Sequence, residues 1–305
     1  MTDAESRYRA DRMAHWDRVA ASKSDPHRLG GFYQQLLEHY YRMMVQPGLR
    51  IMELGCGGGE LLAALKPSLG VGVDFSSEML NIARTKHPVC QFLQADVHDQ
   101  ALDGLEKEAP FDVIILSDLI NDLWDVQAVI EGMRRYCHPG TRIIVNFYSN
   151  LWRIPLGLVK QLGKGADLLS QNWLAQNDVI NLLCLAGFDV INNRSKILLP
   201  LPWKFLAVFF NRFLANIIPF RWFCLTNFIV ARPKPEPAKA PPSVSVIVAA
   251  RNEAGNIEHI LRRVPPLGSR TQLVFVEGHS TDNTYETIEA LMKQHPEKDI
   301  SLYRQ

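Results

Sequence analysis

The chain has 305 residues, a formal net charge of +1 and 47% hydrophobic residues, so it is long enough for about two domains and can bury a substantial core. The near-neutral charge argues against a nucleic-acid partner. Its five cysteines form no CxxC pair, which argues against a disulfide framework and a metal site. The polar N-terminus lacks the apolar core of a signal peptide, and no apolar run reaches the ~20 residues of a membrane span. We therefore predict a cytoplasmic protein.

Four regions follow one another along the chain. Residues 1–47 are helical in pattern, and residues 48–232 alternate strand-like and helix-like stretches. Residues 233–242 contain five prolines and predict an extended, semi-rigid spacer. Residues 243–305 begin again with a strand-like run, which predicts a second, smaller module.

Aromatic residues recur at helical spacing in the first region, at Phe32, Tyr33, Tyr40 and Tyr41. They have two interpretations. The aromatic face either packs against the sheet as core, which is the more common arrangement, or forms a lid over a cationic ligand.

The second region predicts a doubly wound, Rossmann-like α/β domain. Its strand-like runs are Arg50–Leu54, Val71–Asp74, Cys90–Ala95, Phe111–Leu116 and Thr141–Phe147. Helical patterns lie between them, for example Ser77–Lys86 and Val126–Cys137. Strands that alternate with helices predict a parallel sheet, and such sheets bind ligands at the carboxyl ends of their strands.

Candidate ligand groups follow three successive strands. Gly55, Gly57 and Gly59 come directly after the first strand, where glycine lets the backbone pass close to a ligand. Asp74 ends the second strand, where a carboxylate can accept hydrogen bonds from ribose hydroxyls. Asp96 follows the third strand and can accept a hydrogen bond from a purine amine. A single acid at a strand end is more often a helix cap, but three fitting groups in order favour one nucleotide-like site.

At these residues the chain resembles the class I S-adenosylmethionine-dependent methyltransferases, closely over 48–148 and loosely to about 232. The run Glu53-Leu54-Gly55-Cys56-Gly57-Gly58-Gly59 is similar to the first motif of that family, and the run from Gly72 to Leu80 is similar to the second. The resemblance implies S-adenosylmethionine as cofactor and methyl transfer as activity. The residues that it places at the cofactor are Glu53, Gly55, Gly57, Gly59, Asp74, Phe75, Met79, Asp96, Val97 and Ser117.

The same loop argues against a dinucleotide. The dinucleotide pattern is G-x-G-x-x-G, whereas here Gly55, Gly57 and Gly59 alternate with other residues and follow an acid, Glu53. A carboxylate at that position repels a pyrophosphate but suits the amino group of a sulfonium cofactor.

A methyl transfer needs a general base only where the acceptor must lose a proton. The candidates are Asp118 and Asp122, after the fourth strand, and His98, just after Asp96. Each also has a plain structural interpretation, as a helix cap or a solvated loop residue, and the resemblance does not assign a base.

Residues 197–220 are rich in aromatic and aliphatic side chains. We predict one helix between Pro202 and Pro219, with Lys204, Asn211, Arg212 and Asn216 on its polar side. Three interpretations remain: a helix packed on the sheet, the wall of an apolar acceptor pocket, or a peripheral contact with the inner face of the membrane. The last two predict an apolar or lipid-linked small-molecule acceptor.

Residues 243–305 resemble the opening of a family 2 glycosyltransferase domain, which binds a nucleotide sugar. The resemblance rests on the runs Val244–Asn256 and Leu273–Thr284, and it implies that Ala250, Asn252 and Glu253 lie near the nucleotide. The chain departs from the family where Gly278 replaces an acid, and the metal-binding motif and catalytic acid would lie beyond Gln305. We therefore expect no sugar transfer by this chain.

Three hypotheses for function follow. The first is a methyltransferase that acts on an apolar or glycan-linked acceptor. The second is a bifunctional glycan or cell-envelope enzyme whose sugar-transfer half is incomplete, and the third is a non-catalytic scaffold with a nucleotide-binding fold.

Overall fold

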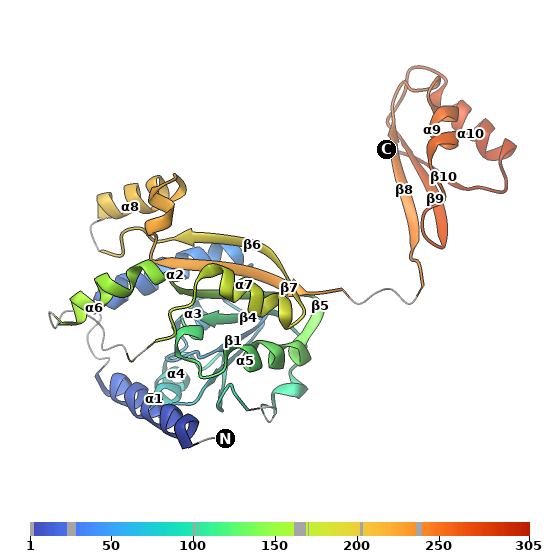
Figure 1. Ribbon diagram of the computed structural model, residues 1–305. Coiled ribbons are helices and arrows are strands. Elements are labelled where there is room, and N and C mark those ends of the chain that lie inside the picture. The colour runs from blue at the N-terminus through green and yellow to red at the C-terminus, as the bar shows by residue number, and fades with distance from the viewer. Residues whose placement is uncertain are drawn as a thin grey trace. The chain divides into compact units, whose positions relative to one another are not determined.

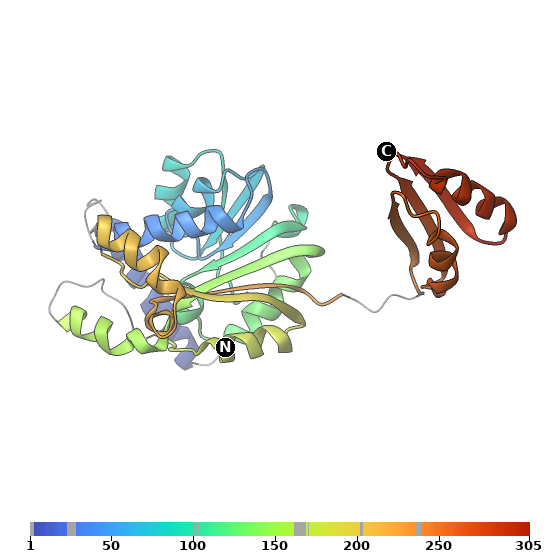
Figure 2. The ribbon, with the colours of Figure 1, turned by 90° about the horizontal axis from the view of Figure 1, so that it is seen from above.

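The computed structural model describes residues 3–22, 29–99, 102, 104–161, 169, 171–201, 204–235 and 240–305. The chain divides into two compact units, Met1–Pro235 and Glu236–Gln305. Part of the predicted spacer, residues 236–239, lies outside the described residues. The path of the chain through both units can be followed in Figures 1 and 2.

The first unit is built on one seven-stranded sheet with the order β3-β2-β1-β4-β5-β7-β6. Strand β7 is antiparallel to both of its neighbours, and the other strands run parallel to one another. The strand order reverses between β1 and β4, which is where open α/β sheets bind their ligands. The strands are β1 (Arg50–Leu54), β2 (Leu69–Asp74), β3 (Gln91–Gln94), β4 (Phe111–Ser117), β5 (Cys137–Tyr148), β6 (Phe188–Lys196) and β7 (Thr226–Pro233).

Buried side chains cover both faces of this sheet, as the prediction of a doubly wound fold requires. Alternate residues of a strand point to opposite faces. Met52 and Leu54 of β1 pack with Val129 and Leu183, which lie on α5 (Val126–Gly132) and α7 (Gln176–Leu185). Ile51, directly before Met52, joins the other core, beside α2 (Leu29–Met44) and α3 (Glu60–Ala64). The Rossmann-like α/β prediction is confirmed.

The aromatic residues of the N-terminal region fall largely into this second core. Tyr33 is 6% exposed and Tyr41 is fully buried, and both lie on α2 against the sheet. Tyr40 is partly buried against the same core. The structure therefore favours the core interpretation of α2. A different segment, α1 (Asp3–Ser22), packs against α4 (Ser77–Lys86) and lies across the carboxyl ends of the strands (Figure 1).

The single helix predicted between Pro202 and Pro219 is wrong. Helix α8 (Lys204–Arg212) ends early, and two short 3₁₀ turns follow it at Leu214–Asn216 and Phe220–Phe223. The Asn216 amide donates a hydrogen bond to the carbonyl of Arg212 at 2.7 Å and so occupies a carbonyl that a longer helix would use. Asn211, predicted on the polar side, is 5% exposed and binds the backbone N–H and C=O of Leu199.

The second unit is a three-stranded parallel sheet with the order β10-β9-β8. Its elements are β8 (Ser243–Ala250), α9 (Ile257–Arg263), β9 (Arg270–Glu277), α10 (Thr284–Gln294) and β10 (Asp299–Arg304). Phe275 of β9 packs with Leu261 of α9 and Ile288 of α10, which gives the unit a core of its own. Both helices cover the same face of the sheet (Figure 1).

Candidate functional site

Three strand ends meet at one edge of the large sheet. The N–H of Gly57, in the loop after β1, donates to Oδ2 of Asp74 at 2.8 Å. The N–H of Ala95, at the end of β3, donates to the carbonyl of Asp74 at 3.1 Å. The groups that the sequence placed at consecutive strand ends therefore lie side by side, with Asp74 between the other two.

The glycines of the loop differ in what surrounds them. All three have positive φ, which L side chains adopt rarely. A Cβ on Gly59 would lie 2.8 Å from the Phe92 ring, and a Cβ on Gly55 would lie 2.7 Å from the Leu119 side chain. A Cβ on Gly57 would meet no atom of the described residues within 4 Å. Close packing explains Gly55 and Gly59, whereas Gly57 borders open space that a ligand can fill.

Glu53 lies inside the protein beneath this loop. It is 3% exposed, and the backbone amide of Leu62 in the first turn of α3 hydrogen-bonds to its carboxylate. Burial raises the pKa of Glu53 well above its usual value. Its Oε2 atom is buried without a hydrogen-bond partner among the described residues. Glu53 therefore holds the start of α3 and retains one oxygen for a further donor.

Asp74 and Asp96 are both anchored by their own surroundings. Besides Gly57, the carboxylate of Asp74 accepts from the N–H of Ser76 at 2.9 Å. Asp96 bonds Nδ1 of His98 at 2.7 Å through Oδ1 and pairs with Arg9 at 3.2 Å through Oδ2. Burial by itself would raise the pKa of Asp96, but the His98 hydrogen bonds and the Arg9 charge outweigh it and lower that pKa. Both carboxylates are thus held in place, and Asp96 is ionised at neutral pH.

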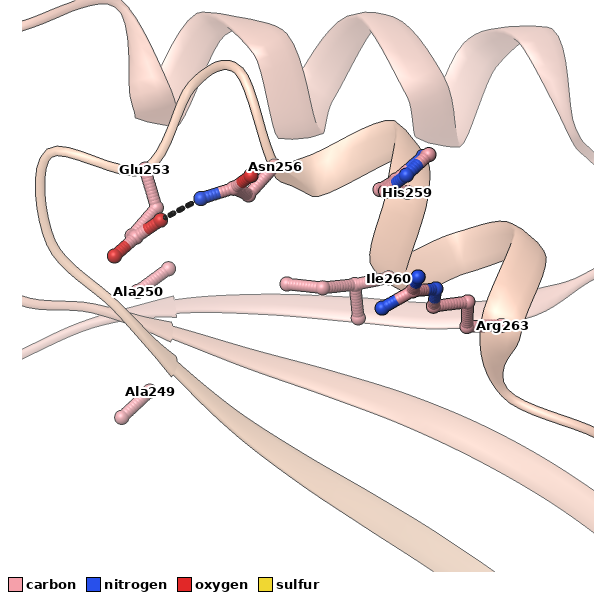
Figure 3. A pocket seen from close by; sticks show the side chains of 7 residues that line it. All are labelled: Ala249, Ala250, Glu253, Asn256, His259, Ile260 and Arg263. Carbon is pink, nitrogen blue, oxygen red and sulfur yellow. Dashed lines mark hydrogen bonds between the residues drawn. The ribbon is translucent and has the colours of Figure 1, made fainter.

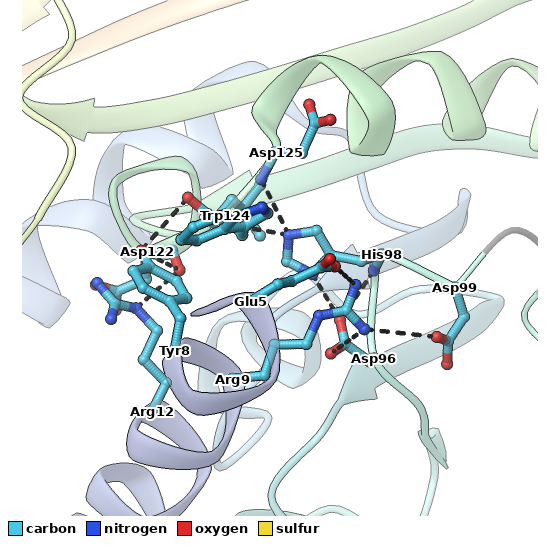
Figure 4. A network of polar contacts seen from close by, with 11 residues as sticks. Glu5, Tyr8, Arg9, Arg12, Asp96, His98, Asp99, Asp122, Trp124 and Asp125 are labelled. Atoms are coloured by element: carbon cyan, nitrogen blue, oxygen red, sulfur yellow. Dashed lines mark hydrogen bonds and ion pairs between the residues drawn. The ribbon is translucent and has the colours of Figure 1, made fainter. Parts of the chain in front are cut away.

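Helix α1 supplies cations to this edge (Figure 4). Arg9 pairs with Asp96 and also with Glu5 on its own helix. Arg12, only 6% exposed, donates from Nε to the carbonyl of Asp122 at 2.9 Å and stacks on Tyr8. Farther along the helix, Asp17 accepts a hydrogen bond from Ser76 at 2.5 Å. Helix α1 therefore contacts the loops that follow β2, β3 and β4.

Asp118, directly after β4, is the candidate base with the most distinctive surroundings. Its φ is +53°, a conformation that is uncommon for a residue with a side chain and often found at functional sites. Its Oδ1 accepts from Tyr33 at 3.0 Å and from the Asn146 amide at 2.7 Å. Burial raises the pKa of Asp118 to about 7, the range in which a carboxylate works well as a general base.

The other two candidates are held by different partners. Both ring nitrogens of His98 have partners, since Nδ1 bonds Asp96 and Nε2 accepts from the backbone N–H of Trp124 at 3.2 Å. Asp122 lies 3.8 Å from Arg12, and burial raises its pKa although the Arg12 charge opposes this. These arrangements favour positioning roles for His98 and Asp122.

The remaining residues predicted at the cofactor surround the same edge. Phe75 and Val97, which follow Asp74 and Asp96 in the chain, are partly exposed, as is Ser117 at the end of β4. Met79 is 1% exposed on α4, and its N–H donates to Ser76, the N-cap of that helix. Met79 is therefore a core residue of α4.

Sequence reasoning missed Arg9, Arg12 and Asn146, and it assigned Tyr33 to packing or a lid without its hydrogen bonds. Asn146 lies on β5, the strand next to β4, and it bonds both Tyr41 and Asp118. A buried asparagine late in an apolar strand is a signal that could have been used, because buried amides need partners.

In the second unit, an open hollow of about 340 Å³ lies at the carboxyl end of β8 (Figure 3). Among its lining residues are Ala250, Glu253 and Arg263. Asn252, beside them, has a φ of +56° and accepts from the N–H of Thr281 at 2.8 Å, so it joins the loops after β8 and β9. Two of the three residues that the sequence placed near a nucleotide, Ala250 and Glu253, therefore line the hollow.

Glu277 is the last residue of β9 and directly precedes Gly278. It accepts hydrogen bonds from the N–H of Ser280 and from Nε of Arg304. The hydrogen bonds from Ser280, with the charge of Arg304, lower the pKa of Glu277 to about 2. Glu277 thus fixes the loop after β9 and joins it to the end of β10.

Residues 46–183 match a family model described as a methyltransferase domain. A ubiquinone biosynthesis O-methyltransferase of Xylella fastidiosa is 29% identical over 146 residues, which are 44% of this chain and 59% of that protein. A demethylmenaquinone methyltransferase of Oceanobacillus iheyensis is 31% identical over 34% of this chain and 46% of that protein. The chain thus spans about half the length of these relatives.

Among solved structures, a methyltransferase of Haloferax volcanii in complex with the Trm112 methyltransferase activator has the same fold. The TM-score is 0.53 at 19% identity, and the match covers 72% of this chain and 98% of the other. The match of residues 46–183 to a methyltransferase domain therefore rests on sequence, and the solved structure shows the same fold.

Proposed function

We propose that this chain transfers a methyl group from S-adenosylmethionine to a small apolar acceptor. The observation that carries the proposal is the meeting of the Gly57 loop, Asp74 and Asp96 at one edge of a methyltransferase-type sheet. This edge is rich in carboxylates, which suits a donor that carries a positive sulfonium and disfavours a pyrophosphate.

The residues at this edge fit the donor by their chemistry. Gly57 leaves room beside the backbone, and Asp74 can accept from ribose hydroxyls because each carboxylate oxygen has two lone pairs. Asp96, with Val97 after it and Phe75 after Asp74, suits an adenine. The unpartnered Oε2 of Glu53 can take a further donor near the loop.

When bound, the donor supplies an electrophilic methyl group, and the methyl–sulfur bond breaks as the bond to the acceptor oxygen or nitrogen forms. The protein holds donor and acceptor on one axis, which can contribute ~7–11 kcal/mol to the rate. Where the acceptor is a hydroxyl, Asp118 takes its proton. Both described hydrogen bonds of Asp118 fall on Oδ1, so Oδ2 is the atom that accepts it.

The acceptor is proposed from two observations. The sequence relatives are named for ubiquinone and menaquinone methylation, and residues 197–225, which are rich in apolar side chains, lead directly into Thr226 beside Tyr33. We therefore favour a lipid-soluble acceptor with an ionisable hydroxyl over a polar metabolite. Methyl-donor turnover against quinols, isoprenoid phenols and lipid-linked sugars tests this choice.

The Gly57→Ala variant tests the donor site. The added methyl group meets no atom of the described residues within 4 Å, so a loss of donor affinity reports ligand contact, and we expect at least a tenfold loss in calorimetry with S-adenosylmethionine. Gly48→Ala is a matched control because Gly48 also has a positive φ, +84°, and open space around it. Both variants carry a similar backbone strain of about 1 kcal/mol or more. Equal donor affinity in both variants and the wild type would contradict the site. Wild-type protein that binds no donor would instead favour a scaffold.

For the second unit we propose a nucleotide-binding role, as in the opening of a family 2 glycosyltransferase. The hollow beside Ala250 and Glu253, at the carboxyl end of a parallel strand, supports it. Titration with a nucleoside diphosphate should shift the amide signals of residues 249–256, and Glu253→Ala should reduce the shift. Signals that do not move at millimolar nucleotide would rule the role out.

A further inference from the structure

The segment between β6 and β7 turns its large apolar side chains outward. Phe205 is 93% exposed and Trp222 is 62% exposed. Over residues 205–223 of this segment the buried side chains are small or polar, namely Ala207, Asn211 and Ala215. Exposed large residues in the same segment are Leu206, Val208, Phe209, Phe213, Ile217, Ile218, Phe220 and Phe223. An ordinary surface helix buries its large apolar residues, so this segment is arranged the opposite way.

The start of α6 (Arg153–Gln161) extends the same surface. Trp152 donates from Nε1 to the carbonyl of Phe223 at 2.8 Å, which fixes the two segments together. Leu151 is 59% and Ile154 is 73% exposed beside this contact. We call the exposed side chains of residues 151–154 and 205–223 the apolar–basic face. Helices α6 and α8 lie at the same end of the first unit in both views (Figures 1 and 2).

All charged side chains in the sequence around this face are basic. Residues 190–235 contain no Asp or Glu, although acids are about a tenth of the chain, with 32 in 305 residues. The basic residues in that range are Arg194, Lys196, Lys204, Arg212, Arg221, Arg232 and Lys234. Arg212 and Arg221 are exposed within the apolar–basic face, as is Arg153 beside Ile154. A partner of this face must therefore be apolar and negatively charged.

We infer that the apolar–basic face binds the surface of an anionic lipid bilayer. Exposed aromatic and aliphatic side chains bordered by arginines match the composition of segments that lie in the membrane interface. No helix among the described residues is long and apolar enough to cross a membrane. The contact is therefore peripheral, with Phe205 and Trp222 entering the headgroup region and the arginines meeting lipid phosphates.

The face also lies at the edge of the sheet that carries the candidate site. Strands β5 and β6 run parallel, and the face follows their carboxyl ends at Tyr148 and Lys196. Thr226, the first residue of β7, shares a hydrogen bond of 3.1 Å with the hydroxyl of Tyr33, which in turn bonds Asp118. If the proposed methyl transfer holds, a lipid-soluble acceptor reaches Asp118 from the bilayer without crossing water.

Flotation of the full-length protein with lipid vesicles tests the inference. Vesicles of phosphatidylcholine with roughly one third phosphatidylglycerol should carry the protein upward, and vesicles of phosphatidylcholine alone should bind it at least about tenfold less. Phe205→Ser/Trp222→Ser should lose binding to both kinds of vesicle by about tenfold or more. Arg212→Gln/Arg221→Gln should lose mainly the preference for the anionic lipid.

Matched controls come from exposed apolar residues elsewhere in the first unit. Val89 is 87% and Leu185 is 76% exposed, so Val89→Ser/Leu185→Ser removes similar surface and should float like the wild type. Wild-type protein that stays with the solvent, or Phe205→Ser/Trp222→Ser that floats unchanged, would overturn the inference. If Phe205→Ser/Trp222→Ser converts a dimer to a monomer and still floats, the inference is also overturned. That result would assign the face to contact with a second copy of the chain.

Donor binding keeps this test separate from the proposed function. Phe205→Ser/Trp222→Ser should bind S-adenosylmethionine as the wild type does, because neither residue belongs to the donor site. If the wild type binds the donor but does not float, the membrane contact alone is overturned. If the wild type floats but binds no donor, the methyl transfer alone is overturned.

Discussion

Replacement of Asp118 by asparagine is expected to lower the rate of methyl transfer to a hydroxyl acceptor by about 10²–10⁴-fold. Asparagine keeps an oxygen that can accept from Tyr33 and Asn146, so the local hydrogen bonds survive while the proton acceptor is lost. The measurement is kcat with saturating donor and acceptor. An acceptor whose attacking atom carries no proton to lose should be affected far less.

The pH dependence gives Asp118 a second readout. The raised pKa of about 7 means that the carboxylate is protonated below pH 7 and ionised above it. Activity should therefore increase as pH rises through 7 and then level off, and Asp118→Asn should remove this step. Because the ionised form is disfavoured in the folded protein, the variant should be no less stable than the wild type above pH 7. Thermal unfolding at pH 8 checks that the loss of rate is not a loss of fold.

Asp122→Asn is the informative comparison for this prediction. Asp122 follows the same strand and is also buried, but it lies beside Arg12 rather than Tyr33. We expect a smaller effect on rate and a step that persists but moves to lower pH, because the charge of Asp122 helps to raise the pKa of Asp118. If Asp122→Asn abolishes the reaction while Asp118→Asn retains it, the base assignment is wrong.

Replacement of Asp74 by alanine should weaken donor binding by about 100-fold, which corresponds to ~2.7 kcal/mol. A hydrogen bond to a charged acceptor is worth ~1.5–3 kcal/mol, and the ribose offers two hydroxyls. The substitution also releases the Gly57 amide, so part of the loss comes from the loop. Calorimetry with S-adenosylmethionine, and with its product, measures the change.

Asp112→Ala provides the control for Asp74. Asp112, near the start of β4, accepts from the backbone N–H of Arg50 at 2.8 Å, so it too is a carboxylate that holds a strand, but at the amino ends of β1 and β4. The Asp112→Ala substitution should lower the free energy of unfolding without changing the donor affinity of the folded protein. A donor affinity that is unchanged in Asp74→Ala would remove the central support of the proposed function.

The parts of this fold that could be predicted are those with local causes. Strand β1 and helix α4 have the predicted bounds, because an apolar strand ends at glycine in one case and Ser76 caps the helix in the other. The order of the strand-end groups also follows from local sequence, since parallel strands bring their carboxyl ends to one edge. The identity and spacing of Gly57 and Asp74 were sufficient to predict their neighbourhood.

The parts that could not be predicted depend on contacts between distant residues. Tyr33 reaches Asp118 across 85 positions and Thr226 across 193. Helix α1 is polar over much of its surface, and only the fold reveals that Arg9 meets Asp96. In the segment after β6, helical periodicity predicted one helix, but the buried Asn211 binds Leu199 and turns the large side chains outward. The hydrophobicity pattern alone does not predict that these large apolar side chains are exposed.

Helix α1 has a consequence for the timing of turnover. Arg9 already occupies one oxygen of the carboxylate proposed for adenine, and Arg12 and Asp17 fasten the helix to the loops on either side. Exchange of the used donor for a new one therefore requires helix α1 to break some of these contacts. Product release, rather than the chemical step, would then limit the turnover rate at saturating substrate. This rate would increase with ionic strength as the ion pair of Arg9 is screened.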